Sequence, residues 1–169
     1  MIAPPSPVVF YSSLQRRLHW LVILLIAVQY LTQKPMREAL QAIELQQSLG
    51  LYQFAITTIH TWVGACIALL MLWRWRLRRR PVPLNGGLMT QRRARWVTAH
   101  HLSLYVAVIV MALSGALHYY FSWSPAARWH ELGKWLLLVL IAIHVLGALS
   151  HLGSASGVLQ RMVGRDSLR

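Results

Sequence analysis

Long runs of apolar residues, separated by short polar segments, dominate the chain and predict its elements. Four such runs lie at about residues 14–33, 54–75, 96–121 and 128–152. Each run is about long enough to cross the roughly 30 Å hydrocarbon core of a bilayer as a helix. The runs nearly fill the 169 residues, so little is left for a soluble part. The pattern therefore predicts an all-α, integral membrane four-helix bundle that forms a single domain over residues 1–169.

The segments between these runs carry residues typical of loops. Residues 1–12 contain three prolines and predict a short flexible tail. Residues 34–52 are predicted to form a loop, in which the stretch from Glu38 to Leu49 favours a short interfacial helix. The segment after the second run combines arginines with prolines and glycines, which indicates a true loop. A very short turn, roughly Ser122 to Ala127, joins the third run to the fourth.

The composition and charge fit a membrane protein. Hydrophobic residues make up 56% of the chain and charged residues only 12%, about half the charged fraction of soluble domains. The net charge of +13 would suggest nucleic acid for a soluble protein, but the basic residues lie at the span ends. Membrane lipid, and not nucleic acid, is therefore the expected partner. Thirteen of the 17 lysines and arginines fall on the side of the two termini. This asymmetry predicts a multi-pass protein of the bacterial inner membrane with both termini in the cytoplasm and the other side facing the periplasm.

Eight histidines lie in or at the edges of the predicted spans. An ionisable residue in hydrocarbon is costly and usually functional. The predicted topology divides these histidines by depth. Toward the cytoplasm lie His19, His100, His101, His144 and His151, and toward the outer side lie His60, His118 and His130. Neutral imidazole is a good axial ligand of haem iron, and two imidazoles saturate the iron, which favours electron transfer over oxygen binding.

The fourth span carries two histidines on nearly one face at two depths. His130 and His144 are fourteen residues apart, which is four helical turns less 40°. The same spacing separates them by about 21 Å along the helix axis. One helix can thus supply a ligand to each of two irons on opposite sides of the membrane.

Matching depths pairs the candidate ligands across helices. His19 and His144 are predicted to hold a haem on the cytoplasmic side, and His60 and His130 a haem on the outer side. His151 competes with His144, because seven residues return it to nearly the same face, but it lies at the membrane border. The only cysteine lies in an apolar run and no C-x-x-C-H motif is present, so any haem is held non-covalently.

Three glycines lie one turn from candidate ligands. Gly64, Gly133 and Gly147 follow His60, His130 and His144 by three or four residues, which places each on the face of its histidine. They are interpreted as clearance for a porphyrin, with small residues at helix contacts as the alternative. His100, His101, His118 and His151 have open roles. One of the His100–His101 pair is a candidate for contact with a haem propionate or a quinone, and His118 fits an aromatic belt beside Tyr119 and Tyr120.

Several short motifs, taken in order, resemble the bacterial cytochrome b561 family of four-helix dihaem membrane proteins. The resemblance covers about Leu14 to Arg165. Its most specific parts are Arg17-Leu18-His19-Trp20, Ile59-His60-Thr61-Trp62-Val63-Gly64, His101-Leu102-Ser103-Leu104-Tyr105, Leu113-Ser114-Gly115, Trp129-His130-Glu131, His144-Val145, Ala148-Leu149-Ser150-His151 and Leu159-Gln160-Arg161-Met162.

The resemblance implies two b-type haems and ubiquinone as a redox partner. It also suggests superoxide as a donor on the periplasmic side, which would make the chain a superoxide:quinone oxidoreductase. The ligand histidines of the family fall on His19, His60, His130 and His144, while His101 and His151 match further family histidines. The loop between the third and fourth spans is shorter than in similar proteins. Lys34, Arg37 and Arg128 are candidates for attracting an anion near the outer haem, or are simple contacts with lipid headgroups.

The leading expectation is a dihaem cytochrome that transfers electrons between a periplasmic-side donor and the quinone pool, with the direction open. The cytoplasmic end near His101 and His151 is the expected quinone site. One alternative is a haem-bearing membrane anchor subunit of a dehydrogenase or hydrogenase. Another, from a different class, is a haem-free transporter lined by the histidines.

Overall fold

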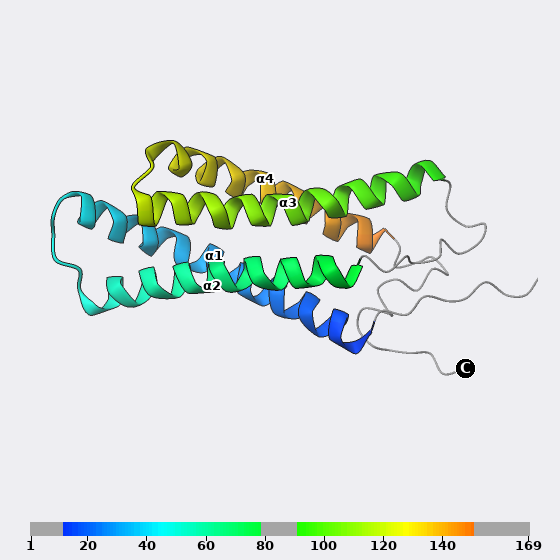
Figure 1. Ribbon diagram of the computed structural model, residues 1–169, viewed down its shortest axis with the longest axis horizontal. Helices are drawn as coiled ribbons and strands as arrows, with labels where there is room; N and C mark the ends of the chain where they lie inside the picture. The colour runs from blue at the N-terminus through cyan, green and yellow to red at the C-terminus, as the bar shows by residue number, and fades with distance from the viewer. Residues whose placement is uncertain (1–11, 79–90, 151–169) are drawn as a thin grey trace, which may run out of the picture.

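Four helices in sequence order make up the computed structural model, which describes residues 12–78 and 91–150 (Figure 1). They are α1 (Ser13–Glu44), α2 (Leu51–Arg78), α3 (Gln91–Phe121) and α4 (Ser124–Leu149). No strand occurs within these two ranges. Successive helices run in opposite directions, so the start of α1 and the end of α4 lie at the same end of the bundle (Figure 1). The predicted all-α helical bundle is confirmed.

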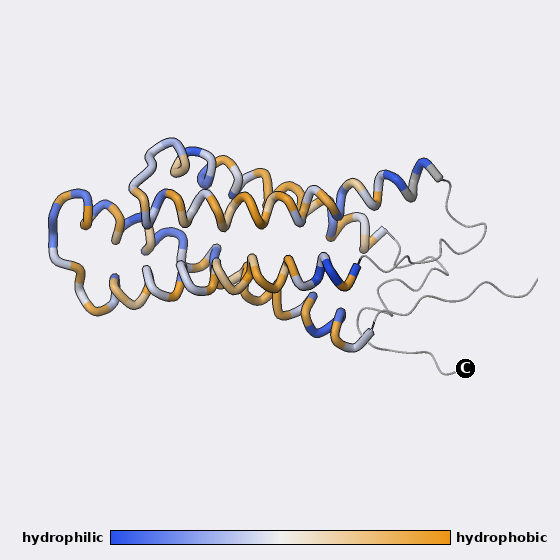
Figure 2. The backbone as a smooth tube through the Cα atoms, in the orientation of Figure 1, coloured by the Kyte–Doolittle hydropathy of each residue, from blue (hydrophilic) through white to orange (hydrophobic). Residues whose placement is uncertain are grey.

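Three of the four helices are long and apolar enough to cross a membrane. They are α2, α4 and the part of α3 from Arg95 to Phe121. Hydrophobic residues are concentrated in the middle of the bundle and hydrophilic ones toward its ends (Figure 2). The apolar stretch of α1 is shorter, because Arg16 and Arg17 precede it and Gln29 and Gln33 follow. The chain is therefore a membrane protein, and a span through α1 stays a prediction.

Helix α1 is longer than the sequence pattern indicated. It begins with a capping box at Ser12, whose hydroxyl accepts from the backbone N–H of Gln15 at 3.2 Å. It then continues through Pro35 to Glu44, so the prediction of a loop with a separate short helix from Glu38 is wrong here. Met36, Ala39 and Ala42 are buried at helical spacing. Burial of this face offsets the hydrogen bond that the proline removes.

The connection between α3 and α4 is even shorter than predicted. Helix α4 begins at Ser124, with a proline in its first turn, so only Ser122 and Trp123 separate the two helices. Proline suits this position because the first helical N–H groups have no intrahelical acceptor. Ser122 takes a left-handed conformation with φ of 52°, which reverses the chain within two residues.

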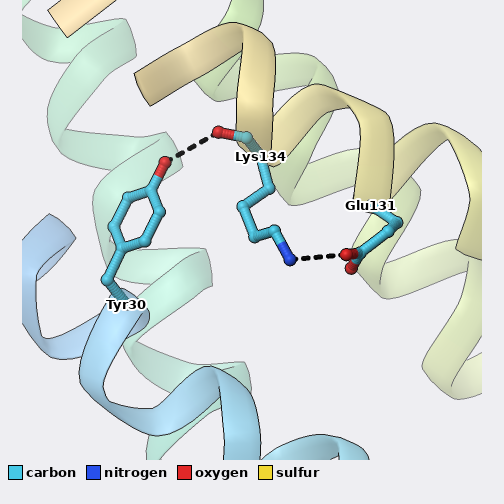
Figure 3. A network of polar contacts seen from close by, with 3 residues as sticks. All are labelled: Tyr30, Glu131 and Lys134. Atoms are coloured by element: carbon cyan, nitrogen blue, oxygen red, sulfur yellow. Dashed lines mark hydrogen bonds and ion pairs between the residues drawn. The ribbon is translucent and has the colours of Figure 1, made fainter. Parts of the chain in front are cut away.

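The helices pack as two pairs, α1 with α2 and α3 with α4, and α2 joins the pairs by contacting α3. A small apolar cluster with members from all four helices forms the centre: Val22, Ile67, Met71, Tyr105, Val108 and Leu137. A further link crosses from α1 to α4, where the Tyr30 hydroxyl donates to the Lys134 carbonyl at 2.8 Å (Figure 3). The Lys134 ammonium in turn pairs with Glu131 on its own helix (Figure 3). Most other large apolar side chains face outward, as lipid-facing residues do.

Candidate functional site

Four histidines from three helices gather at one end of the bundle, where α1 begins and α4 ends. We call this the inner end as a label only. His144 on α4 is at the centre of this group, which we call the inner cluster. Its ring centroid is 6.1 Å from that of His19 on α1, 5.9 Å from that of His100 and 5.2 Å from that of His101, both on α3. The structure thus brings together the predicted pair His19/His144 and adds both histidines of α3.

The separation of His19 and His144 suits a shared metal ion. Two imidazoles on opposite sides of one ion have ring centroids roughly 6 Å apart, since each bond is about 2 Å and each ring adds about 1 Å. The observed 6.1 Å agrees with this value, and so does the 5.9 Å between the rings of His100 and His144. Haem iron needs only two protein ligands. By contrast, no three histidine, cysteine or acidic side chains converge on one point to hold a bare ion within residues 12–78 and 91–150.

The second pair, His60 on α2 and His130 on α4, lies toward the opposite end of the bundle. The Nδ1 of His60 is 2.8 Å from the hydroxyl oxygen of Thr32, and that hydroxyl donates to the Val28 carbonyl, also at 2.8 Å. A threonine hydroxyl has one proton, so His60 must donate from Nδ1. Its Nε2 then carries the lone pair that iron ligation requires.

His130 is held in the same tautomer by a different group. Its Nδ1 is 2.9 Å from the backbone carbonyl oxygen of Met111 on α3. A carbonyl only accepts, so Nδ1 carries the proton and Nε2 is again available as a ligand. His101 of the inner cluster shows the same arrangement, with Nδ1 2.7 Å from the Val97 carbonyl oxygen.

His19 differs from these three histidines in its hydrogen-bond partner. Its Nδ1 lies 3.3 Å from Nη2 of Arg74 on α2, and Nη1 of the same guanidinium donates to the Gln15 carbonyl at 3.1 Å. Arginine only donates, so Nδ1 of His19 is the acceptor in this contact. A cation therefore lies directly beside one of the candidate iron ligands.

Gly115 on α3 provides the space for the His130 ring. A Cβ atom at this position would lie 3.0 Å from Cε1 and 3.1 Å from Nδ1 of His130. Gly115 also comes one turn after Met111, so its missing side chain leaves the Met111 carbonyl open to the imidazole. Sequence reasoning did not assign this role to Gly115. The signal was present in the sequence, because Gly115 is the only glycine of α3 and follows a serine.

The three glycines predicted to clear a porphyrin have different surroundings. A Cβ at Gly133 would lie 2.6 Å from Sδ of Met111, so this glycine allows close contact between α4 and α3. A Cβ at Gly64 would make an ordinary contact with the Gln29 side chain at 3.8 Å. At Gly147 a Cβ would meet nothing within 4 Å. Porphyrin clearance stays a prediction for all three.

Two histidines have buried ring nitrogens without a hydrogen-bond partner in the described part of the chain. They are Nε2 of His100 in the inner cluster and Nδ1 of His118 on α3. Buried polar atoms are normally satisfied, so each of these nitrogens indicates a ligand or solvent contact. His151, the competitor of His144, lies outside the described residues.

The fold and the clustered histidines define a class of protein, a helical membrane protein with imidazoles gathered inside its bundle. Comparison with known families matches residues 10–165 to the family described as prokaryotic cytochrome b561, and the chain belongs to this family. A search of curated proteins finds no match. Membership makes the chain a membrane b-type haem protein of electron transport. The family resemblance seen in the sequence is thereby confirmed.

Proposed function

We propose that the chain is a dihaem electron-transfer cytochrome with axial ligand pairs His19/His144 and His60/His130. The observation that carries the proposal is the 6.1 Å separation of the His19 and His144 rings, at the opposite end of the bundle from His60 and His130. When bound, each non-covalent haem b supplies a one-electron couple. Ligands from α1, α2 and α4 would hold the two irons, with α4 contributing to both.

The residues around each pair determine which imidazole nitrogen is available. Thr32 and the Met111 carbonyl accept hydrogen bonds from Nδ1 of His60 and His130. These bonds orient both rings and direct Nε2 away from the two acceptors. Both acceptors are neutral, so neither draws the proton off the imidazole. The outer pair is thus prepared to act as two neutral nitrogen ligands.

We further propose that the electrons move between a periplasmic-side donor and ubiquinone, in the inner membrane of a bacterium with both termini in the cytoplasm. Superoxide is the proposed donor, and the chain would then act as a superoxide:quinone oxidoreductase. The basic residues Lys34, Arg37 and Arg128 lie at the end of the bundle that carries His60 and His130. Lys34 is paired with Glu38, so Arg37 and Arg128 are the residues proposed to attract a small anion. Family membership supports a quinone as the second partner.

An optical spectrum of the purified full-length chain tests the haem content. The dithionite-reduced minus oxidised difference spectrum is expected to show a b-type α-band, with two haems per chain by quantitative extraction. Mixing the oxidised protein with a superoxide source should produce the reduced band, and adding a ubiquinone analogue should reverse it. One haem per chain would contradict the two-pair assignment, and failure of both redox steps would contradict the proposed partners.

The hydrogen bond from His60 to Thr32 gives a milder test of the outer pair. Replacing Thr32 by valine keeps the shape of the side chain but removes the acceptor of the Nδ1 proton. Loss of such a partner is expected to lower the affinity of a metal site about tenfold or more. The measurement is haem retention of the Thr32→Val chain against that of Thr58→Val, because Thr58 is exposed and bonds only the Phe54 carbonyl. Equal retention in the two variants would argue against this role.

A further inference from the structure

Arg74 is the cation of the inner cluster, and its hydrogen bond to His19 is informative about the haem site. In neutral imidazole, one ring nitrogen carries a proton and the other a lone pair. Arg74 occupies the lone pair of Nδ1, so the proton of His19 is on Nε2 in this contact. Iron ligation through Nε2 requires the opposite tautomer, and ligation through Nδ1 would use the same lone pair. The Arg74 contact and iron ligation by His19 therefore exclude each other.

A second observation concerns the charge that Arg74 brings to this end of the bundle. The side chain is half-buried and lies at the end of the apolar run of α2, just before Arg76 and Arg78. In the described part of the chain the carboxylates belong to Glu38, Glu44 and Glu131, which all lie at the other end of the bundle. Two of them pair with lysines of their own helices. A guanidinium released from His19 thus keeps the Gln15 carbonyl as an acceptor but has no carboxylate among the described residues at this end of the bundle. A half-buried guanidinium in this position favours an anionic partner.

These two observations together identify an anion site at the inner pair. We propose that Arg74 exchanges acceptors when haem is held by His19 and His144, and binds a propionate carboxylate of that haem in place of His19. This inference rests on the proposed function. Haem b carries two carboxylates, and the guanidinium fork matches a carboxylate in a bidentate manner. Arg74 is then a positioning residue that acts both on haem affinity and on the potential of the inner haem.

The charge of Arg74 predicts the sign of the effect on the potential. Reduction lowers the positive charge on the iron by one, so a nearby cation favours the reduced form. Replacing Arg74 by glutamine is expected to lower the midpoint potential of the inner haem and leave that of the outer haem unchanged. Arg74→Lys keeps the charge without the fork, so it should preserve most of the potential and weaken haem binding. Arg76→Gln is the matched control, because Arg76 is exposed and lies two residues along the same helix.

A double-mutant-type cycle, in which Arg74 and the haem carboxylates are removed separately and together, isolates their interaction. The full-length chain is reconstituted with haem b or with its dimethyl ester, which lacks the carboxylates. Wild type and Arg76→Gln are expected to bind haem b at the inner pair about tenfold more tightly than the ester, the effect of one charge-assisted hydrogen bond. Arg74→Gln should show no preference between the two. The outer haem, retained in each variant, reports that the bundle is folded.

The outcomes separate the two proposals. If Arg74→Gln keeps the preference for free carboxylates and an unchanged potential, Arg74 does not bind a propionate. That result overturns the inference and leaves the dihaem assignment intact. If wild type binds fewer than two haems, the proposed dihaem function fails whatever Arg74 does. If His144→Ala retains both haems, the assignment of His144 as an inner ligand fails.

Discussion

Replacement of His144 by alanine is expected to remove one of two haems from the purified chain. His144 is the centre of the inner cluster, with the ring centroids of three other histidines within 6.1 Å. Alanine offers no lone pair to the iron, and His19 alone would leave a five-coordinate site of much lower affinity. The difference spectrum should lose about half of its α-band intensity, and extraction should give one haem per chain.

The matched variant for this experiment is His151→Ala. His151 lies seven residues further along the sequence, and its substitution is expected to leave both haems in place. Retention of both haems in His144→Ala, together with loss of one in His151→Ala, would transfer the inner ligand to position 151. A parallel His100→Ala chain tests whether His100 is an iron ligand. The His100 ring is stacked on that of His144, and its Nε2 has no hydrogen-bond partner among the described residues. Two haems in that chain would exclude His100 as a ligand.

Enlarging Gly115 is expected to remove the other haem. A leucine at this position would place its Cβ about 3 Å from the His130 ring, with three further carbon atoms in the space that the imidazole occupies. The ring would have to rotate away, and its hydrogen bond to the Met111 carbonyl would be lost with it. Gly115→Leu should therefore retain only the inner haem, while Gly115→Ala should retain both with weaker outer binding.

A control enlarges another side chain of the same helix. Leu113→Phe adds less volume than Gly115→Leu, two residues earlier on α3 at a position that is 59% exposed. This variant is expected to keep two haems with unchanged midpoint potentials. Equal haem loss in Gly115→Leu and Leu113→Phe would indicate general damage to α3, and two haems in Gly115→Leu would contradict the assignment of His130 to the outer site.

The sequence predicted the helices and the end of the bundle at which each described histidine lies, because apolar run length and helical rise are local properties. It therefore also anticipated that His19 and His144 meet. The partners of the ligands were not predicted. The Met111 carbonyl, Thr32 and Arg74 reach their histidines from neighbouring helices, and such contacts depend on which helix faces meet. Periodicity within one span carries no information on that choice.

Helix α1 is longer than predicted for a related reason. Pro35 and the charged residues around it satisfy the local rules for a helix end. The helix nevertheless continues, since Met36, Ala39 and Ala42 are covered by the rest of the bundle. Burial against other helices thus decides whether α1 continues past Pro35, and the residues that cover this face are remote in sequence. Gly133 illustrates the same point, because its position faces Met111 of α3 and its surroundings could not be read from α4 alone.

Helix α4 is uninterrupted from Ser124 to Leu149, and it carries a candidate ligand for each iron. The distance between His130 and His144 along the helix axis is therefore fixed by one stretch of backbone. It does not depend on how α1 and α2 pack. Deleting a single residue between the two histidines would turn one imidazole by 100° relative to the other, whereas deleting seven would nearly keep the face and shorten the distance by about 10 Å. The helical register of α4 thus sets both the mutual orientation and the spacing of the two candidate ligands that it carries.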